Sequence, residues 1–329
     1  MRHSFLRVSV AGVMTALTVS AGAQTAATTP RPAAGGNVVA DVRAAMARQD
    51  FAGAEAILKA YREERGTTSQ ALAALSWLGR GALAAKMYEQ AALYAEDAYE
   101  LAVAALGVDI GRIDRDADLE IALGAAIEVQ SQVRAARGNR SDAVYFLGRE
   151  LETYGGTALH KRIQKNINLL SLAGQPAPAL TAGEYLGPPL SPDRLKGKVV
   201  LLFFWAHWCP DCKAQAPVLA TLLARHRAEG LAIVAPTQRY GYTVRRAEPA
   251  QPDEELRHIV EVRDAHYSFL KDDPIPVSAA VHNRYGVSTT PTLALVDRQG
   301  VVRLYRPGNL TEAELEREIV PLLGAPAPR

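Results

Sequence analysis

Cysteine is scarce in this chain of 329 residues, which has only Cys209 and Cys212. A structural zinc site requires a complete tetrahedral set of ligands, and no second Cys or Cys/His pair is present to complete one. A structural disulfide stabilises a fold mainly by closing a long loop, and these two residues enclose a very short one. We therefore expect a reactive redox pair, no metal and no other cofactor.

The chain also lacks any long block of one charge. It has 37 Lys and Arg against 35 Asp and Glu, a formal net charge of +2. Proteins that bind nucleic acid present a clustered basic surface to the phosphates. A nucleic-acid partner is therefore not expected.

The N-terminus lacks an apolar run long enough to span a bilayer. Arg2 and Arg7 precede an apolar stretch at 8–19, which at 12 residues is shorter than the roughly 20 that a membrane helix needs. Ala21-Gly22-Ala23 follows, and this order is typical of a secretory signal peptide over 1–23, with an uncleaved anchor as the alternative. No cysteine follows the run to carry a lipid, so we expect an exported protein, periplasmic or secreted.

Proline is absent from residues 38–172, where Ala, Leu, Glu and Arg are frequent and apolar residues recur three and four positions apart. This pattern predicts an all-helical domain over 38–173. It follows a Pro/Gly/Ala/Thr segment at 24–37 that reads as a flexible leader.

Part of this region resembles the helix-turn-helix pattern of tetratricopeptide repeats. Leu78-Gly79, Ala82, Ala91 and Ala98 follow that pattern, in which small residues let two helices approach closely, although its echoes elsewhere are irregularly spaced. We expect either a degenerate tetratricopeptide-like domain or a plain helical bundle. The first would offer a concave surface to a partner protein, and the second would be a spacer or dimerisation module.

The helical pattern ends at Gly174, followed by Pro176 and Pro178, which prevent a helix from continuing. A second domain is predicted over 174–324, with a Pro-rich tail at 325–329. It contains four short apolar runs: Val199 to Trp205, Leu231 to Ala235, Leu293 to Val296 and Val301 to Tyr305. The first three are typical of strands buried on both faces of an α/β sheet, and the fourth is the expected antiparallel hairpin partner of the third.

Cys209 directly follows the first of these runs and precedes Pro210, a residue suited to the first position of a helix. Cys209 would then be the N-cap, with its sulfur over unpaired N–H groups that favour the thiolate. We expect Cys209 to be the exposed nucleophile and Cys212 the buried thiol that resolves the mixed disulfide. Lys213 adds a positive charge nearby, whereas Asp211 would repel a thiolate.

The segment from Lys196 to Lys213, with Trp208-Cys209-Pro210-Asp211-Cys212 inside it, resembles the TlpA-type branch of the thioredoxin superfamily. The resemblance runs from about 177 to 323 and includes Pro217, which matches the proline in the family's active-site helix. It implies a thioredoxin fold behind the helical domain, and a thiol–disulfide oxidoreductase with reduction mildly preferred.

The resemblance also covers Tyr285-Gly286-Val287-Ser288-Thr289-Thr290-Pro291-Thr292, which is similar to the family's cis-proline loop. It implies that Pro291 is cis and that the backbone at Thr290 faces the sulfurs and pairs with a substrate strand. The residues implied to support the two catalytic cysteines are Trp208, Pro210, Asp211, Lys213, Thr290 and Pro291.

Two acids of the family's usual pattern are missing. Phe203 stands where thioredoxins carry a buried acid, and Gln215 stands where many TlpA-type reductases carry a glutamate. Proton transfer at Cys212 then lacks its usual base. A second function is therefore an alternative, in which the helical repeats bind a partner and the thioredoxin-like module is redox-inactive. A peroxidase is a weaker third alternative, because the C-x-x-C spacing favours thiol–disulfide exchange.

The leading hypothesis is therefore an enzyme that exchanges electrons with protein thiols and disulfides. An unknown electron donor or acceptor restores its cysteine pair, and the helical domain selects the partner.

An enlarged segment at 237–274 contains Arg239-Tyr240-Gly241-Tyr242 and Arg245-Arg246. It either shapes the substrate groove or is a solvated excursion with its own helix from about 252 to 270. His207 is expected at the surface.

Overall fold

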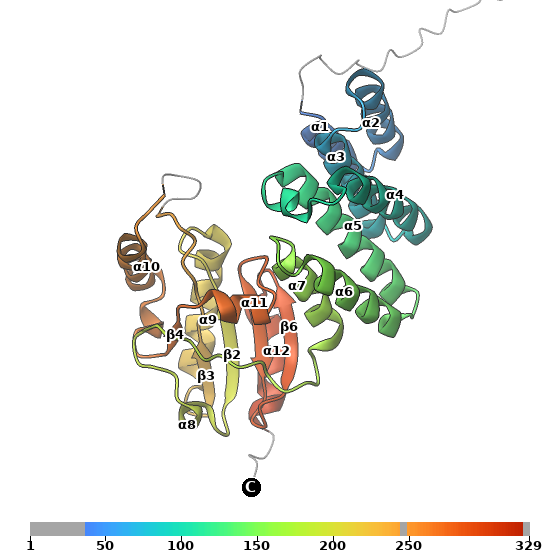
Figure 1. Ribbon diagram of the computed structural model, residues 1–329. Helices are drawn as coiled ribbons and strands as arrows, with labels where there is room; N and C mark the ends of the chain where they lie inside the picture. The colour runs from blue at the N-terminus through green and yellow to red at the C-terminus, as the bar shows by residue number, and fades with distance from the viewer. Residues whose placement is uncertain (1–36, 244–248, 325–329) are drawn as a thin grey trace, which may run out of the picture. The chain divides into compact units, whose positions relative to one another are not determined.

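The computed structural model describes residues 37–243 and 249–324, coloured along the chain in Figure 1. The expected signal peptide at 1–23, nearly all of the leader at 24–37, Arg245-Arg246 and the tail at 325–329 lie outside the described residues.

Residues 38–171 are helical apart from short turns, which confirms the predicted all-helical region. The helices are α1 (Val38–Ala47), α2 (Phe51–Arg65), α3 (Ser69–Ala84), α4 (Tyr88–Leu106), α5 (Ala117–Ala136), α6 (Arg140–Tyr154) and α7 (His160–Ser171), with a 3-10 turn, η1 (Ile110–Asp114). Side chains of Asn37, Asp50, Thr68 and Asp116 accept hydrogen bonds from the first turns of α1, α2, α3 and α5. These caps explain where the helices begin.

Small residues let α3 and α4 pack closely. A Cβ atom placed on Gly79 would lie in ordinary van der Waals contact with α4, 3.8 Å from the carbonyl oxygen of Ala91 and 3.7 Å from the amide nitrogen of Ala95, so this position has room for a methyl group and for nothing much larger. Ala91 and Ala98 are fully buried in the same apolar cluster as Leu78. The Leu-Gly and alanine pattern noted in the sequence therefore lies at a helix–helix contact, as the repeat-like interpretation requires.

The second half is built on a four-stranded sheet in the order β3-β2-β5-β6. Its strands are β2 (Val199–Phe204), β3 (Leu231–Val234), β5 (Thr292–Val296) and β6 (Val302–Pro307). β2 is parallel to β3 and antiparallel to β5, and β5 is antiparallel to β6. All four apolar runs thus form strands, and the hairpin between the last two is confirmed.

The remaining elements connect and cover this sheet (Figure 1). They are β1 (Tyr185–Leu186), α8 (Pro192–Leu195), α9 (Pro210–His226), α10 (Pro252–His266), η2 (Ser268–Leu270), β4 (Ile275–Pro276), α11 (Ala279–Arg284) and α12 (Glu312–Leu323). β1 and β4 form a separate antiparallel pair. The α/β arrangement is the thioredoxin-like fold that the sequence predicted.

Strand β2 explains why its sequence is apolar throughout. Val199, Leu201 and Phe203 belong to one buried cluster with residues of α9 and α12. Val200, Leu202 and Phe204 alternate with them and belong to the cluster that contains residues of α11. Helices therefore cover both faces of the sheet, and the loop after Phe204 carries the chain to α9 and the cysteines.

His282 of α11 is fully buried against the sheet. Its ring lies edge-on to Phe204 with 5.4 Å between ring centroids, and its Nδ1 is 3.1 Å from the Ser278 carbonyl oxygen. Burial, with a smaller contribution from the Lys161 ammonium, lowers the pKa of His282 to about 3, against the raising effect of the hydrogen bond to the Ser278 carbonyl. The native state therefore holds a neutral imidazole over the whole range in which an exposed histidine becomes protonated.

We expect His282 to make the protein acid-sensitive. Its folded pKa is lower than its unfolded pKa of about 6.5, so the unfolded state binds more protons as the pH falls from 6.5 towards 3 and stability falls with it. Between pH 7 and pH 5 this side chain should cost about 2 kcal/mol of unfolding free energy. Urea denaturation at both pH values measures this. His282→Leu should show a smaller difference, and an unchanged difference would contradict the assignment.

Candidate redox site

The start of α9 holds the two cysteines. Cys209 is the N-cap, its Sγ accepts a hydrogen bond from the Cys212 amide at 3.1 Å, and Pro210 occupies the first turn. Cys209 and Cys212 form a disulfide with 5.3 Å between Cα atoms. The predicted cap is confirmed, and it places a sulfur where a helix N-terminus stabilises negative charge.

The prediction that Cys209 is exposed is wrong for this oxidised form. Cys209 is only 2% exposed and Cys212 is fully buried. The Sγ atom of Cys209 lies 3.4 Å from the Thr290 carbonyl oxygen, and this is a van der Waals contact because a disulfide sulfur carries no proton. Cys209 also belongs to the apolar cluster beneath the sheet, so neighbouring segments cover a sulfur that the helix start alone would leave open.

Strand β5 positions the loop that contacts the disulfide. The Thr290–Pro291 peptide bond is cis, and β5 begins at the next residue, Thr292. The Thr292 hydroxyl donates to the Thr289 carbonyl at 2.7 Å, which fixes the turn into the strand. The structure therefore brings Thr290 to Cys209, as the resemblance implied.

The other supporting residues surround the helix start unequally. Trp208 is half-buried, with its ring 5.4 Å from that of Tyr240. Pro210 and Asp211 are exposed on the first turn of α9, and Lys213 is half-buried. Asp211 is therefore in water, where its charge acts weakly on the sulfurs.

Gln215 has a structural role at the position where the family pattern has an acid. Its side chain is buried and bridges the backbone of Leu310, donating to the carbonyl at 2.9 Å and accepting from the amide at 2.9 Å. Phe203, at the other missing acid, packs in the core with its ring 5.7 Å from that of Tyr267. Neither residue can take a proton from Cys212.

His207 is buried beside the cysteine motif, so the expectation that it lies at the surface is wrong. It is 1% exposed, and its Nε2 is 3.2 Å from a carboxylate oxygen of Glu255. Its ring also contacts the rings of Tyr240, Tyr242 and His258 at centroid distances of 5.2 to 5.8 Å. Burial lowers the pKa of His207 and favours the neutral imidazole, against the opposing effect of Glu255.

Glu255 of α10 is a buried acid that sequence reasoning missed. It is 1% exposed and accepts hydrogen bonds from the backbone amides of Tyr240 and Gly241 as well as facing His207. The carboxylate therefore ties the 240–241 loop to the residue that lies two positions before Cys209. Nothing local distinguishes it from Asp253 and Glu254, which are exposed.

We expect Glu255→Gln to destabilise the protein by about 2–4 kcal/mol. The carboxylate accepts from donors at both oxygens, and an amide would turn an NH₂ group towards one of them and leave it unpaired. Urea denaturation measures the loss. The matched control, Glu254→Gln, changes the same charge on an exposed neighbour and should stay within about 0.5 kcal/mol; equal effects of the two substitutions would refute the role of Glu255.

The segment at 237–274 is packed onto the site where the structure describes it. Glu255, Ile259 and Val262 of α10 are buried, and the Arg239 guanidinium forms a two-pronged ion pair with Glu184 that includes a 2.8 Å contact. Tyr240 packs against both Trp208 and His207. The expected helix exists, but it covers the core and is not a purely solvated excursion.

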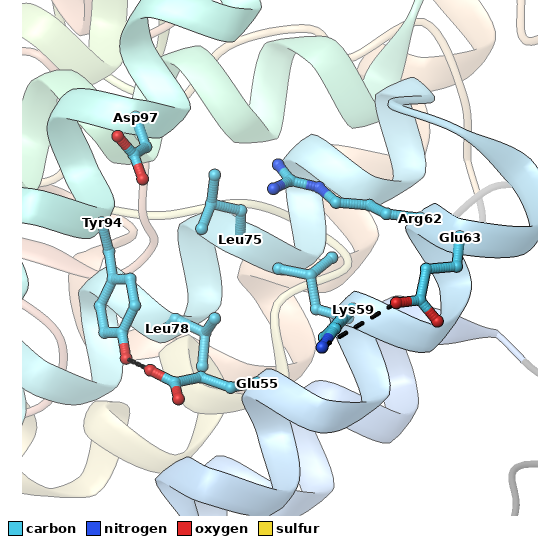
Figure 2. Close-up of a pocket in the computed structure, with 9 residues that line it drawn as sticks. Glu55, Lys59, Arg62, Glu63, Leu75, Leu78, Tyr94 and Asp97 are labelled. Atoms are coloured by element: carbon cyan, nitrogen blue, oxygen red, sulfur yellow. Dashed lines mark hydrogen bonds and ion pairs between the residues drawn. The ribbon is translucent and has the colours of Figure 1, made fainter.

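A hollow of about 390 Å³ lies among α2, α3 and α4, away from the cysteines in the sequence. Figure 2 shows Arg62 and Asp97 on opposite sides of it, and Tyr94 in contact with Glu55. Two guanidinium nitrogens of Arg62 are buried without a hydrogen-bond partner among the described residues. This hollow gives the helical half a candidate polar contact surface.

Two features are absent from the described residues, 37–243 and 249–324. There, no group of three or more His, Cys, Asp or Glu side chains is arranged to hold a metal ion. Within the same ranges, no helix has both the length and the apolar character needed to cross a bilayer.

Comparisons with known proteins agree with this geometry. Residues 173–305 match the AhpC/TSA family. Thioredoxin-like protein YneN of Bacillus subtilis is 28% identical over 146 residues, covering 44% of this chain and 78% of its own. The thiol:disulfide interchange protein DsbE of Xylella fastidiosa is 28% identical over 155 residues, with coverage of 46% and 70%.

A third relative extends the same picture. The thiol-disulfide oxidoreductase ResA of Bacillus thuringiensis is 25% identical over 143 residues, covering 44% of this chain and 74% of its own. Each match covers less than half of the present chain. Residues 173–305, which contain the C-x-x-C centre and the cis-proline loop, are therefore the part of this chain that is similar to the AhpC/TSA family and to these thiol-disulfide oxidoreductases.

Proposed function

We propose that this protein is an extracytoplasmic thiol–disulfide oxidoreductase that exchanges electrons with protein thiols and disulfides. The observation that supports this most directly is the Cys209–Cys212 disulfide at the start of α9, in contact with the loop at Thr290. The names of the relatives, thiol-disulfide oxidoreductase and thiol:disulfide interchange protein, support the same chemistry.

The proposed reaction starts from the reduced dithiol. The Cys209 thiolate, stabilised by the Cys212 amide and the helix N-terminus, attacks a substrate disulfide and forms a mixed disulfide while one substrate thiolate leaves. Cys212 then loses its proton and attacks Cys209, which forms the Cys209–Cys212 disulfide and releases the second substrate thiolate. The protein gives two electrons to the substrate, and the two substrate thiolates take up one proton from Cys212 and one from the solvent. An unidentified thiol donor then reduces the Cys209–Cys212 disulfide again.

Export and partner selection are parts of the same proposal. The N-terminal sequence supports export, because Arg2 is followed by an apolar run and then by Ala21-Gly22-Ala23. Disulfides form and persist in oxidising compartments outside the cytoplasm, which supports the same location. The hollow with the unpaired Arg62 nitrogens supports a partner-binding helical half (Figure 2).

Equilibration of the full chain with glutathione buffers tests the proposed activity. Trapping of free thiols should show one reversible two-electron transition, with a potential nearer the thioredoxin value of about −270 mV than the DsbA value of about −120 mV if reduction is the direction. A cysteine pair that does not titrate reversibly would instead support the alternative, an interaction protein with a redox-inactive module. The burial of Cys209 and the absence of acids at Phe203 and Gln215 favour that alternative.

A further inference from the structure

A polar cavity of about 600 Å³ adjoins the cis-proline loop. Val287, Ser288 and Thr289 of that loop line it together with Gln238 and Tyr240. The rest of its lining comes from the helical half: Arg80 of α3, Glu120 and Glu128 of α5, and Ala158, Lys161, Arg162 and Lys165 in or just before α7. Two segments distant in sequence therefore share one cavity.

The lining of this cavity adjoins two residues that flank or contact the reacting sulfur. Thr289, in its lining, precedes Thr290, whose carbonyl oxygen is 3.4 Å from Cys209 Sγ. Tyr240, also in the lining, packs against Trp208, the residue before Cys209. A protein substrate whose cysteine reaches Cys209 would place neighbouring residues at or in this cavity.

The charged side chains of the cavity do not balance. Arg162 and Lys165 both pair with Glu128, at 2.9 Å and 3.2 Å. Glu120 is the second acid of the lining, and burial, with a contribution from Asp114, raises its pKa. The lining therefore has four cationic side chains and two acids, and one of these acids, Glu128, is paired with both Arg162 and Lys165.

Lys161 and Arg80 are the cations without a paired acid. Lys161 Nζ donates to the amide oxygen of Gln238 at 3.0 Å, and Arg80 lies over the Trp77 ring at 4.7 Å from the centroid. Among the described residues neither forms an ion pair. Burial lowers the pKa of both groups, which means that their charges are partly removed from water. The Glu128 carboxylate partly opposes this for Arg80 without forming an ion pair, and burial is the whole cause for Lys161.

The hollow in Figure 2 does not have this arrangement. Acidic side chains of Glu55, Glu63 and Asp97 outnumber the cations Lys59 and Arg62 there, and no loop of the redox centre lines it. The cavity at Lys161 combines an unpaired positive charge with proximity to the disulfide.

We propose that this cavity binds acidic side chains that flank the reactive cysteine of the protein substrate, with Lys161 and Arg80 as specificity-determining residues. The inference rests on the proposed thiol–disulfide exchange and names the substrate class for that site. A carboxylate entering the cavity replaces the water lost by these two cations and holds the substrate disulfide near Cys209.

Three peptide disulfides of one sequence test the proposal, with Glu, Gln or Lys at the positions flanking the cysteines. Pre-reduced full chain is mixed with each, and acid-quenched samples give the second-order rate constant for disulfide reduction. The Glu peptide should react about tenfold faster than the Gln peptide at low salt, and the ratio should shrink as ionic strength rises. The Lys peptide should be slowest.

The double variant Lys161→Gln with Arg80→Gln should reduce the Glu-to-Gln ratio to below about twofold. Its matched control, Lys198→Gln with Lys271→Gln, removes the same charge from exposed positions and should keep the wild-type ratio. Similar ratios in the two double variants would overturn the assignment to Lys161 and Arg80.

The remaining outcomes separate this inference from the proposed function. If all three peptides react at one rate, the acidic preference is wrong and thiol–disulfide exchange stands. If no peptide reacts, the exchange activity itself fails and the inference with it. Glutathione disulfide is a further substrate in this assay. If the Lys161→Gln, Arg80→Gln variant slows its reduction but does not change the rates of the three peptides, the cavity is a site for small thiols and the protein-substrate assignment is overturned.

Discussion

Replacing Cys209 with serine should abolish the reduction of protein disulfides, with a loss of at least about a thousandfold. Serine keeps the cap on α9, since its hydroxyl can accept from the Cys212 amide as the sulfur does. The fold should therefore survive while the nucleophilic thiol at the N-cap is removed and Cys212 remains. Reduction of a protein disulfide, followed by thiol release, measures the loss.

Cys212→Ser should behave differently, because it removes the resolving thiol and keeps the nucleophile. The mixed disulfide between Cys209 and the substrate should then accumulate, and intact-mass analysis under non-reducing conditions should detect it. Urea denaturation of both variants against the reduced wild-type chain controls for folding. Activity of Cys209→Ser within tenfold of wild type would place the chemistry elsewhere.

Much of this fold could be predicted because its signals are local. The absence of proline with three- and four-residue apolar spacing gave the helices through Ser171, and the continuous run at Val199–Phe204 gave a strand covered on both faces. The cap at Cys209 was equally local, since a cysteine before Pro210 after a buried strand has few other conformations.

The surroundings of the disulfide could not be predicted in this way. Glu255 faces His207 across 48 positions, and its buried environment depends on how α10 packs rather than on any local pattern. The burial of Cys209 depends likewise on Thr290, 81 positions away. Long-range packing thus decides which polar residues belong to the site, and the sequence around each of them carries no sign of it.

The contact between α7 and the cis-proline loop leads us to expect a large loss of stability when Gly286 is replaced. Gly286 lies near the start of that loop with φ of +59°, and a Cβ atom there would lie 2.6 Å from the carbonyl carbon of Gln164. The Asn168 side chain also donates to the Arg284 carbonyl at 3.4 Å. The backbone of α7 therefore packs directly on the chain that leads to Thr290, and only glycine fits between them.

Gly286→Ala should cost about 3–5 kcal/mol of unfolding free energy, because the methyl group combines an unfavourable φ with a clash against backbone that cannot move aside. Gly197→Ala is the matched control, with φ of +70° and open space around the added carbon, and should cost only about 1–2 kcal/mol. Urea denaturation compares them, and equal losses would mean that α7 does not pack on Gly286.

Gly286→Ala should also change the substrate preference of the redox reaction. Lys165 of α7 and residues 287–289 line one cavity, so moving α7 away from Gly286 separates Lys161 from the loop beside Cys209. In the peptide assay, Gly286→Ala should therefore lose the preference for Glu over Gln, whereas Gly197→Ala should keep it. A Gly286→Ala protein that is destabilised yet retains the full preference would show that the cations select substrate without this contact.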